Sequence, residues 1–77
     1  MGKIPEPTIL RLSAYRSCLE DYKAHSNQPF ISSRELGKLS NRNAAIVRKD
    51  LSYFGEYGVP GKGYNVDHLQ NNIVRIL

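Results

Sequence analysis

The chain has 77 residues, and its eleven lysines and arginines outnumber its seven aspartates and glutamates, which gives a net charge of +4. A length of this order allows one domain, over residues 1–77, and the basic balance favours a polyanionic partner. The single cysteine excludes a disulfide scaffold, and no Cys/His group has the spacing of a zinc module. There is no apolar run long enough for a membrane span, and the polar start MGKIPEP excludes a secretion signal. We therefore expect a soluble cytoplasmic domain.

The first predicted element is a helix over residues 5–25. Pro5 and Pro7 suit its first turn, because a proline there gives up an N–H group that has no intrahelical partner. The sequence SNQP at 26–29 ends the helix, and the apolar pair at 30–31 that follows indicates one brief strand. Apolar residues recur along the helix at three- and four-residue steps and predict one buried stripe of Ile9, Leu12, Tyr15, Leu19 and Tyr22.

A second, short helix is predicted from about Ser33 to Leu39. Ser32 and Glu35 have the spacing of a capping box, in which the hydroxyl accepts a helix-start N–H and the carboxylate reaches back to the cap. Leu36 and Leu39 are expected to face inward.

A third helix is predicted over about residues 44–54, after the tight turn SNRN at 40–43. Asn43 is its expected N-cap, and Gly55 is its expected end. At about 100° per residue the helix divides into two faces. The buried face holds Val47, Leu51 and Phe54, and the outward stripe holds Ala45, Arg48, Lys49 and Ser52.

The segment from residue 55 to residue 65 is rich in glycine, which excludes a helix and predicts two short strands around a turn. Tyr57 and Tyr64 are the expected strand residues, and Lys62 lies near the tip. A last helix is predicted over 66–77, capped by Asn65, with an apolar face of Val66, Leu69, Ile73, Ile76 and Leu77.

This order of elements predicts an α+β, mostly α, winged helix-turn-helix fold with a three-helix core, a small β-hairpin wing over about 56–65 and a C-terminal helix. The small and polar outward stripe of the third helix suits a major groove, since arginine can bind a guanine edge and lysine a base or a phosphate. The wing, with its glycines and Lys62, can approach the adjacent backbone or a narrow minor groove. Sequence-specific binding of double-stranded DNA is therefore predicted.

Three alternatives remain beside that function. Basic residues on an exposed helix face are usually plain solvated surface. Winged helices also serve as protein–protein interaction modules without DNA binding. A general chromosome-coating protein would bind any duplex equally.

Three stretches, IPEPTILRLSAYRSCLE, SSRELGKL and VRKDLSYFGEYGVPGKGYNVDHL, resemble the N-terminal domain of the Rex family of bacterial redox-sensing transcriptional repressors. The resemblance covers essentially the whole chain, and RKDLSYFG with GYNV is its most specific part. Members of that family carry a winged-helix DNA-binding domain followed by a Rossmann domain for NADH or NAD⁺. They bind palindromic operators as homodimers and release them when NADH accumulates. The resemblance implies an operator-reading domain that is not an enzyme and that is monomeric or weakly dimeric in isolation.

The sequence departs from the family in two places. It ends at NNIVRIL, where the family's nucleotide-binding domain begins, and it contains no GxGxxG. We therefore expect an excised or truncated domain that binds no cofactor itself, with NADH or NAD⁺ bound only in the missing C-terminal domain. The second departure is Ile46, where family members often carry a polar residue such as glutamine, and this residue bears on operator preference.

By the resemblance, the helix that holds Arg48 and Lys49 is the recognition helix, and residues 61–64 belong to the wing. Arg11 lies in the motif RL..Y, where it either contacts a backbone phosphate or braces the domain. Phosphate contacts are expected from Arg11, Lys49 and Lys62, and base contacts from Arg48 or Lys49. The full set of predicted DNA-binding residues is Arg11, Ser32, Ser33, Ala45, Arg48, Lys49, Ser52, Tyr53, Lys62, Gly63 and Tyr64.

Four further titratable residues can be interpreted either as functional residues or as ordinary structural and surface residues. Asp50 is either an orienting partner for an arginine or a wing backbone group, or an ordinary surface carboxylate. Cys18 is expected to be a small packing residue rather than a redox sensor. His25 and His68 have no evident partner for catalysis or for a metal, so the sequence offers no support for an enzyme.

Overall fold

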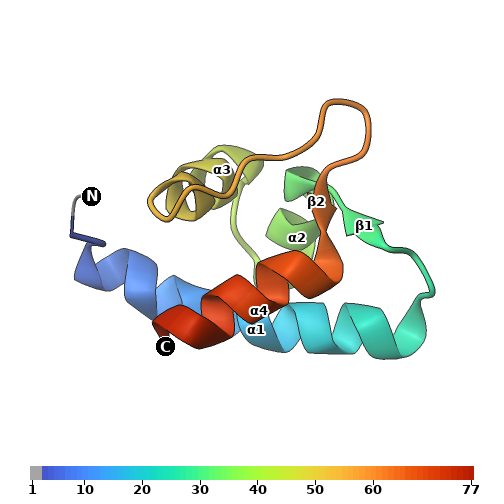
Figure 1. Ribbon diagram of the computed structural model, residues 1–77, viewed down its shortest axis with the longest axis horizontal. Helices are drawn as coiled ribbons and strands as arrows, with labels where there is room; N and C mark the ends of the chain where they lie inside the picture. The colour runs from blue at the N-terminus through green and yellow to red at the C-terminus, as the bar shows by residue number, and fades with distance from the viewer. Residues whose placement is uncertain (1–2) are drawn as a thin grey trace.

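The computed structural model describes residues 3–77. Its elements follow in the order α1 (Glu6–His25), β1 (Phe30–Ile31), α2 (Ser33–Ser40), α3 (Ala44–Ser52), β2 (Tyr64–Asn65) and α4 (Val66–Ile76). Helices α1 and α4 lie side by side, and α2 and α3 pack together above them (Figure 1). The segment between α3 and β2 projects away from α1 and α4 as a loop (Figure 1). This mostly helical α+β architecture is the predicted one.

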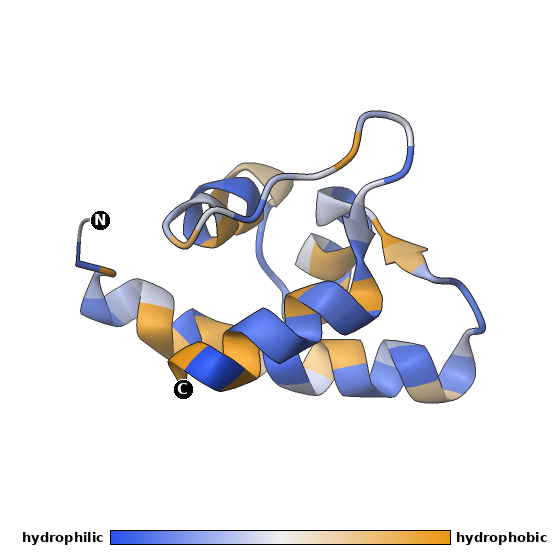
Figure 2. Cartoon of the chain, in the orientation of Figure 1, coloured by the Kyte–Doolittle hydropathy of each residue, from blue (hydrophilic) through white to orange (hydrophobic). Residues whose placement is uncertain are grey.

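The core lies where the apolar stripes of the helices meet. Hydrophobic and hydrophilic residues alternate along each helix (Figure 2), so that each helix buries one face. The buried hydrophobic residues are Leu12, Tyr15, Leu19, Ile31, Leu36, Val47, Leu51, Tyr64, Val66, Leu69 and Ile73. Burying one such side chain contributes about 1.5–3 kcal/mol, so these residues dominate the stability of a domain of this size. Within residues 3–77, no helix has both the length and the hydropathy that a bilayer span requires.

Two residues expected on the buried faces lie outside them. Leu39 and Leu77 are 45% and 47% exposed. The buried face of α2 is centred on Leu36 and Gly37, and at about 100° per residue this centre faces Ser40 rather than Leu39. Gly37 occupies that place because a Cβ there would lie 2.6 Å from the carbonyl oxygen of Arg42, in the turn to α3.

All three predicted N-caps are present. Ser32 Oγ accepts the Glu35 N–H at 2.9 Å, Asn43 Oδ1 accepts the Ile46 N–H at 2.8 Å, and Asn65 Oδ1 accepts the His68 N–H at 2.8 Å. These bonds satisfy N–H groups that have no intrahelical partner, so the starts of α2, α3 and α4 are fixed by local sequence. Helix α3 ends at Ser52, two residues before the predicted end, and residues 53–55 form a turn.

The sheet differs from the predicted wing hairpin. Strand β2 pairs antiparallel with β1, in the register Phe30↔Asn65 and Ile31↔Tyr64, rather than with a strand at Tyr57. Tyr57 is 72% exposed and outside any strand, so its assignment to a strand was wrong. Within the wing (residues 56–65), the pairing before β2 is a single bridge between Val59 and Gly63. The remainder is a loop, because Gly58 and Pro60 disfavour a continuous ladder.

Candidate nucleic-acid interface

Helix α3 presents an exposed polar stripe, as predicted. Ala45, Arg48 and Lys49 are exposed and Ser52 is half-buried, and we call these four residues the reading face. The opposite side of the helix carries Val47, Asp50 and Leu51, all buried.

Arg48 faces the wing. Its Nη1 donates a hydrogen bond to Ser33 Oγ at 3.2 Å, which links α3 to the start of α2. Arg48, the start of α2 and the wing together line an open groove of about 310 Å³. The residues that line this groove are Ser32, Ser33, Arg48, Gly58, Val59, Pro60, Gly61, Gly63 and Tyr64. Five of them belong to the predicted DNA-binding set, so the fold brings together residues that lie far apart in the sequence.

Lys49 lies on the other flank of α3. It lines a second hollow, of about 280 Å³, between α3 and the beginning of α1. Tyr53 and Ile46 line the same hollow, together with Pro5, which precedes α1, and with residues of α1. The two adjacent cations of the reading face are therefore separated: Arg48 is directed toward the wing, and Lys49 toward the start of α1.

The wing carries one cation and is tethered at its base. Lys62 Nζ lies 5.5 Å from the centroid of the Phe30 ring, a distance that allows a cation–π contact. The turn is closed by the Gly63 N–H, which bonds to the Val59 carbonyl at 2.8 Å, and Gly61 and Gly63 have φ of +78° and +96°. A Cβ on Gly63 would collide with the backbone of Ile31, so glycine allows the wing to reach β1.

Tyr64 does not belong to the exposed surface of the wing. Its side chain is 5% exposed, and it packs in the hydrophobic core. Burial raises the pKa of its phenol above the ordinary value. This burial argues against a DNA contact by the Tyr64 ring, which β2 points inward, opposite to its neighbour Asn65.

Asp50 is buried, with 1% of its surface exposed, and within residues 3–77 the hydrogen-bond partners of its side chain all belong to α1. Oδ1 accepts hydrogen bonds from Thr8 Oγ1 and Arg11 Nη2, both at 2.9 Å. Oδ2 accepts from Arg11 Nε and Tyr15 Oη, both at 2.6 Å. We call Asp50, Thr8, Arg11 and Tyr15 the Asp50 cluster. The interpretation of Asp50 as a surface carboxylate was wrong, and its orienting interaction is with an arginine from another helix.

The protonation of the cluster follows from these contacts. Burial alone would raise the pKa of Asp50, but the hydrogen bonds from Arg11, Tyr15 and Thr8 lower it below its ordinary value. The pKa of Tyr15 is raised, first by burial and then by its bond to Asp50. The pKa of Arg11 is raised chiefly by the bond to Asp50. The carboxylate is therefore ionised and the phenol neutral near pH 7, which is the combination that these hydrogen bonds require.

The cluster changes the role expected for Arg11. Two of its three nitrogens bond to Asp50, and its side chain is 26% exposed. This geometry favours bracing of the domain over contact with a phosphate. Removing one partner of a buried ion pair costs about 3–5 kcal/mol, whereas replacing the whole pair with packed apolar residues is often neutral.

Sequence analysis missed two residues of this region. Thr8 shares a face of α1 with Arg11 and Tyr15, at i, i+3 and i+7, and this spacing was the available signal. Glu56, at the start of the wing, is 7% exposed and accepts hydrogen bonds from Asn72 and, at 3.0 Å, from His68 Nε2 when that nitrogen is protonated. No local pattern in the sequence predicts the contacts of Glu56, since both partners, Asn72 and His68, lie on α4.

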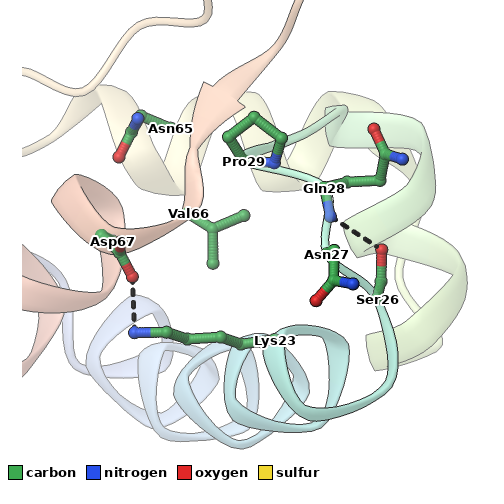
Figure 3. A pocket seen from close by; sticks show the side chains of 8 residues that line it. All are labelled: Lys23, Ser26, Asn27, Gln28, Pro29, Asn65, Val66 and Asp67. Atoms are coloured by element: carbon green, nitrogen blue, oxygen red, sulfur yellow. Dashed lines mark hydrogen bonds and ion pairs between the residues drawn. The ribbon is translucent and has the colours of Figure 1, made fainter.

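A polar pocket of about 350 Å³ lies elsewhere in the molecule (Figure 3). It is lined by the end of α1, the segment 26–29, Asn65 of β2 and the start of α4, and by no residue of α3. Its lysine, Lys23, is paired with Asp67 at 2.6 Å (Figure 3), so this pocket offers little net charge to an anion.

The chain matches the family model described as "Putative DNA-binding protein N-terminus" over residues 3–52. It is 48% identical over 76 residues to the redox-sensing transcriptional repressor Rex of Syntrophobacter fumaroxidans. This alignment covers 99% of this chain and 36% of the relative. It is 47% identical over 75 residues to Rex of Thermotoga petrophila, in an alignment that covers 97% of this chain and 36% of the relative. The chain thus spans about a third of the length of these curated relatives.

Solved structures give the same result. The structure is similar to that of RSP in complex with beta-NAD⁺ and operator DNA, with a TM-score of 0.85 and 37% identity over 99% of this chain and 35% of that chain. It is also similar to RSP in complex with beta-NADH, with a TM-score of 0.79 and 35% identity over 100% of this chain and 34% of that chain. Because the family model covers more than half of its length, the chain belongs to the family of DNA-binding protein N-termini and corresponds to the N-terminal domain of the Rex family.

Proposed function

We propose that this chain binds double-stranded DNA sequence-specifically, as the operator-reading domain of a redox-sensing transcriptional repressor. Helix α3 enters the major groove, and the wing lies on the adjacent minor groove or backbone. As part of a repressor, the domain acts in the cytoplasm, where the bacterial chromosome lies, and it performs no catalysis.

One observation carries this proposal. Arg48 on the reading face and the wing line a single groove, in a fold that matches a repressor in complex with operator DNA at a TM-score of 0.85. Two such elements that face the same way can contact one duplex together, because the helix enters a groove while the wing contacts the neighbouring backbone.

The two cations of α3 have different roles in this arrangement. Arg48 can present its guanidinium to a guanine edge, a contact that requires the planar fork of arginine. Its bond to Ser33 is exposed, so a base or a phosphate can replace or extend it. Lys49, on the other flank, is suited to a backbone phosphate, as is Lys62 on the wing.

We place the nicotinamide cofactor outside these 77 residues. A dinucleotide site needs a glycine-rich turn between a strand and a helix, and residues 3–77 contain no such unit. By the family relationship, a further domain binds NADH or NAD⁺ and joins two copies on a palindromic operator.

The test is a fluorescence-anisotropy titration of the 77-residue chain. One probe is a duplex selected by this chain from a randomised pool (the selected duplex), and the other has the same composition in scrambled order (the shuffled duplex). We expect tighter binding to the selected duplex, and a fall in affinity of roughly 12-fold from about 50 to about 200 mM salt, because Lys49 and Lys62 each neutralise one phosphate. Binding that ignores salt, or no binding, would instead favour a protein-docking module. Equal affinity for both duplexes would favour a chromosome-coating protein.

A further inference from the structure

Asp50 lies on the side of α3 that faces away from the reading face. At about 100° per residue, it is rotated by about 150° from the centre of the stripe formed by the reading face. Its side chain is buried and contacts α1 alone through side-chain hydrogen bonds. It cannot touch a duplex that lies against the reading face, yet it is attached to the same short helix.

The contacts of Asp50 are directional in a way that apolar packing is not. Arg11 binds both carboxylate oxygens through its Nε and Nη2, so the planes of the two groups are fixed relative to each other. Thr8 and Tyr15 bind the same oxygens from one turn before and one turn after Arg11. Any rotation of α3 about its axis, or any slip along α1, lengthens several of these bonds together.

This arrangement matters because base reading tolerates little error. The side chains of a binding site have to be held by supporting contacts within about 0.5 Å and 10–20° of the geometry in which they bind. Phosphate contacts by flexible lysines are less demanding, since a lysine acts as a point charge on a long stem. A contact that sets the rotation of α3 should therefore affect sequence discrimination more than general affinity for DNA.

We propose that Asp50 is a positioning residue for sequence reading: through its four hydrogen bonds to α1, it sets the orientation of α3 and thereby the preference of the reading face for one DNA sequence. This inference rests on the proposed function, and it adds a residue that acts on DNA only through Arg48 and its neighbours.

The test compares two affinities in the Asp50→Asn variant of the 77-residue chain. Asparagine keeps the size of the side chain, but its amide nitrogen faces donors of Arg11 and Tyr15 and cannot accept their bonds. We expect the ratio of the two dissociation constants, shuffled over selected duplex, to fall by about tenfold relative to the natural chain. We expect the affinity for the shuffled duplex and the slope of log K against log salt to change by less than about twofold.

Two further variants separate positioning from stability. Thr8→Val removes one donor and keeps the ion pair, so we expect a smaller loss of the ratio, of about threefold. If Asp50→Asn does not fold, Thr8→Val serves as the test variant in its place. Ile73→Val weakens the core from α4 but removes none of the hydrogen bonds to Asp50, and we expect it to lower stability without changing the ratio.

The outcomes are distinct. If Asp50→Asn and Thr8→Val fold and discriminate as the natural chain does, or if Ile73→Val lowers the ratio equally, the positioning role is overturned while DNA binding stands. If the variants lose affinity for both duplexes in proportion, the contact supports folding alone, and the proposal is equally overturned. If the natural chain fails to bind any duplex, the proposed function fails, and this inference fails with it.

Discussion

The Asp50 cluster and the wing lie on different sides of α3, and they are built in opposite ways. In the cluster, a buried carboxylate is held by four side-chain hydrogen bonds from one helix. In the wing, residues 57–62 are exposed, and the loop is closed by a single bridge and two glycines with positive φ. Directional bonds on one side and a glycine-rich loop on the other suit two tasks. In the proposed function, one side holds a helix in register with bases, and the other follows a backbone of variable shape.

The largest expected effect comes from breaking the rigid side. Asp50→Ala removes the acceptor of four hydrogen bonds and leaves Tyr15 and Thr8 buried without it. We expect the free energy of unfolding to fall by about 3–5 kcal/mol, as for other buried pairs that lose one member. Urea denaturation followed by circular dichroism measures this change. A loss below about 1 kcal/mol would show that the cluster is weakly coupled to the fold.

The same contact should be visible in the pH dependence of stability. The pKa of Asp50 is lowered in the folded protein, so the folded state binds fewer protons than the unfolded state between the two pKa values. Its contribution is complete above the ordinary aspartate pKa of about 4, and it is lost as the pH falls through that value toward the lower folded pKa. Unfolding curves of the natural chain and of Asp50→Asn should therefore converge as the pH falls through this range. Parallel curves would contradict the assignment.

The reading face gives the next effect. Arg48→Ala removes the guanidinium that lines the wing groove, and we expect binding to the selected duplex to weaken by about 1–3 kcal/mol, with a loss of preference over the shuffled duplex. Lys49→Ala is the matched control, since it removes one charge from the same helix on the other flank. If Lys49→Ala costs the preference and Arg48→Ala does not, the two roles are reversed.

The smallest effect is expected in the wing. Lys62→Ala should weaken binding to the selected and shuffled duplexes alike, and it should lower the salt slope by about one, because it removes one phosphate contact. Stability should change little, since the side chain is exposed and, within residues 3–77, its contact is with the Phe30 ring. A loss of sequence preference in this variant would mean that the wing also reads bases.

Local features were predictable from the sequence, because the residues that cause them are neighbours. Ser32, Asn43 and Asn65 cap helices within three residues of themselves, and the stripes of α1, α3 and α4 follow the helical period. The outward position of Arg48 and Lys49 follows from the same period. For this reason the helix order and the reading face were both accessible.

Features that depend on distant partners were not predictable. Strand β2 pairs with β1 and not within the wing, because Gly63 allows close approach to Ile31, which no local pattern reveals. Asp50 follows Lys49 in the sequence, and an aspartate beside a lysine is the residue type expected on an exposed surface. Only the position of α1 shows that three donors converge on it.

The central claim is that α3 and the wing contact one duplex together. The most direct measurement is a titration of the ¹⁵N-labelled chain with the selected duplex, followed by NMR chemical-shift changes. The account predicts the largest changes at Ser33, Arg48, Lys49 and Lys62, with small changes at Lys23 and Asp67 in the pocket of Figure 3. Changes concentrated at that pocket, with α3 and the wing unaffected, would contradict it.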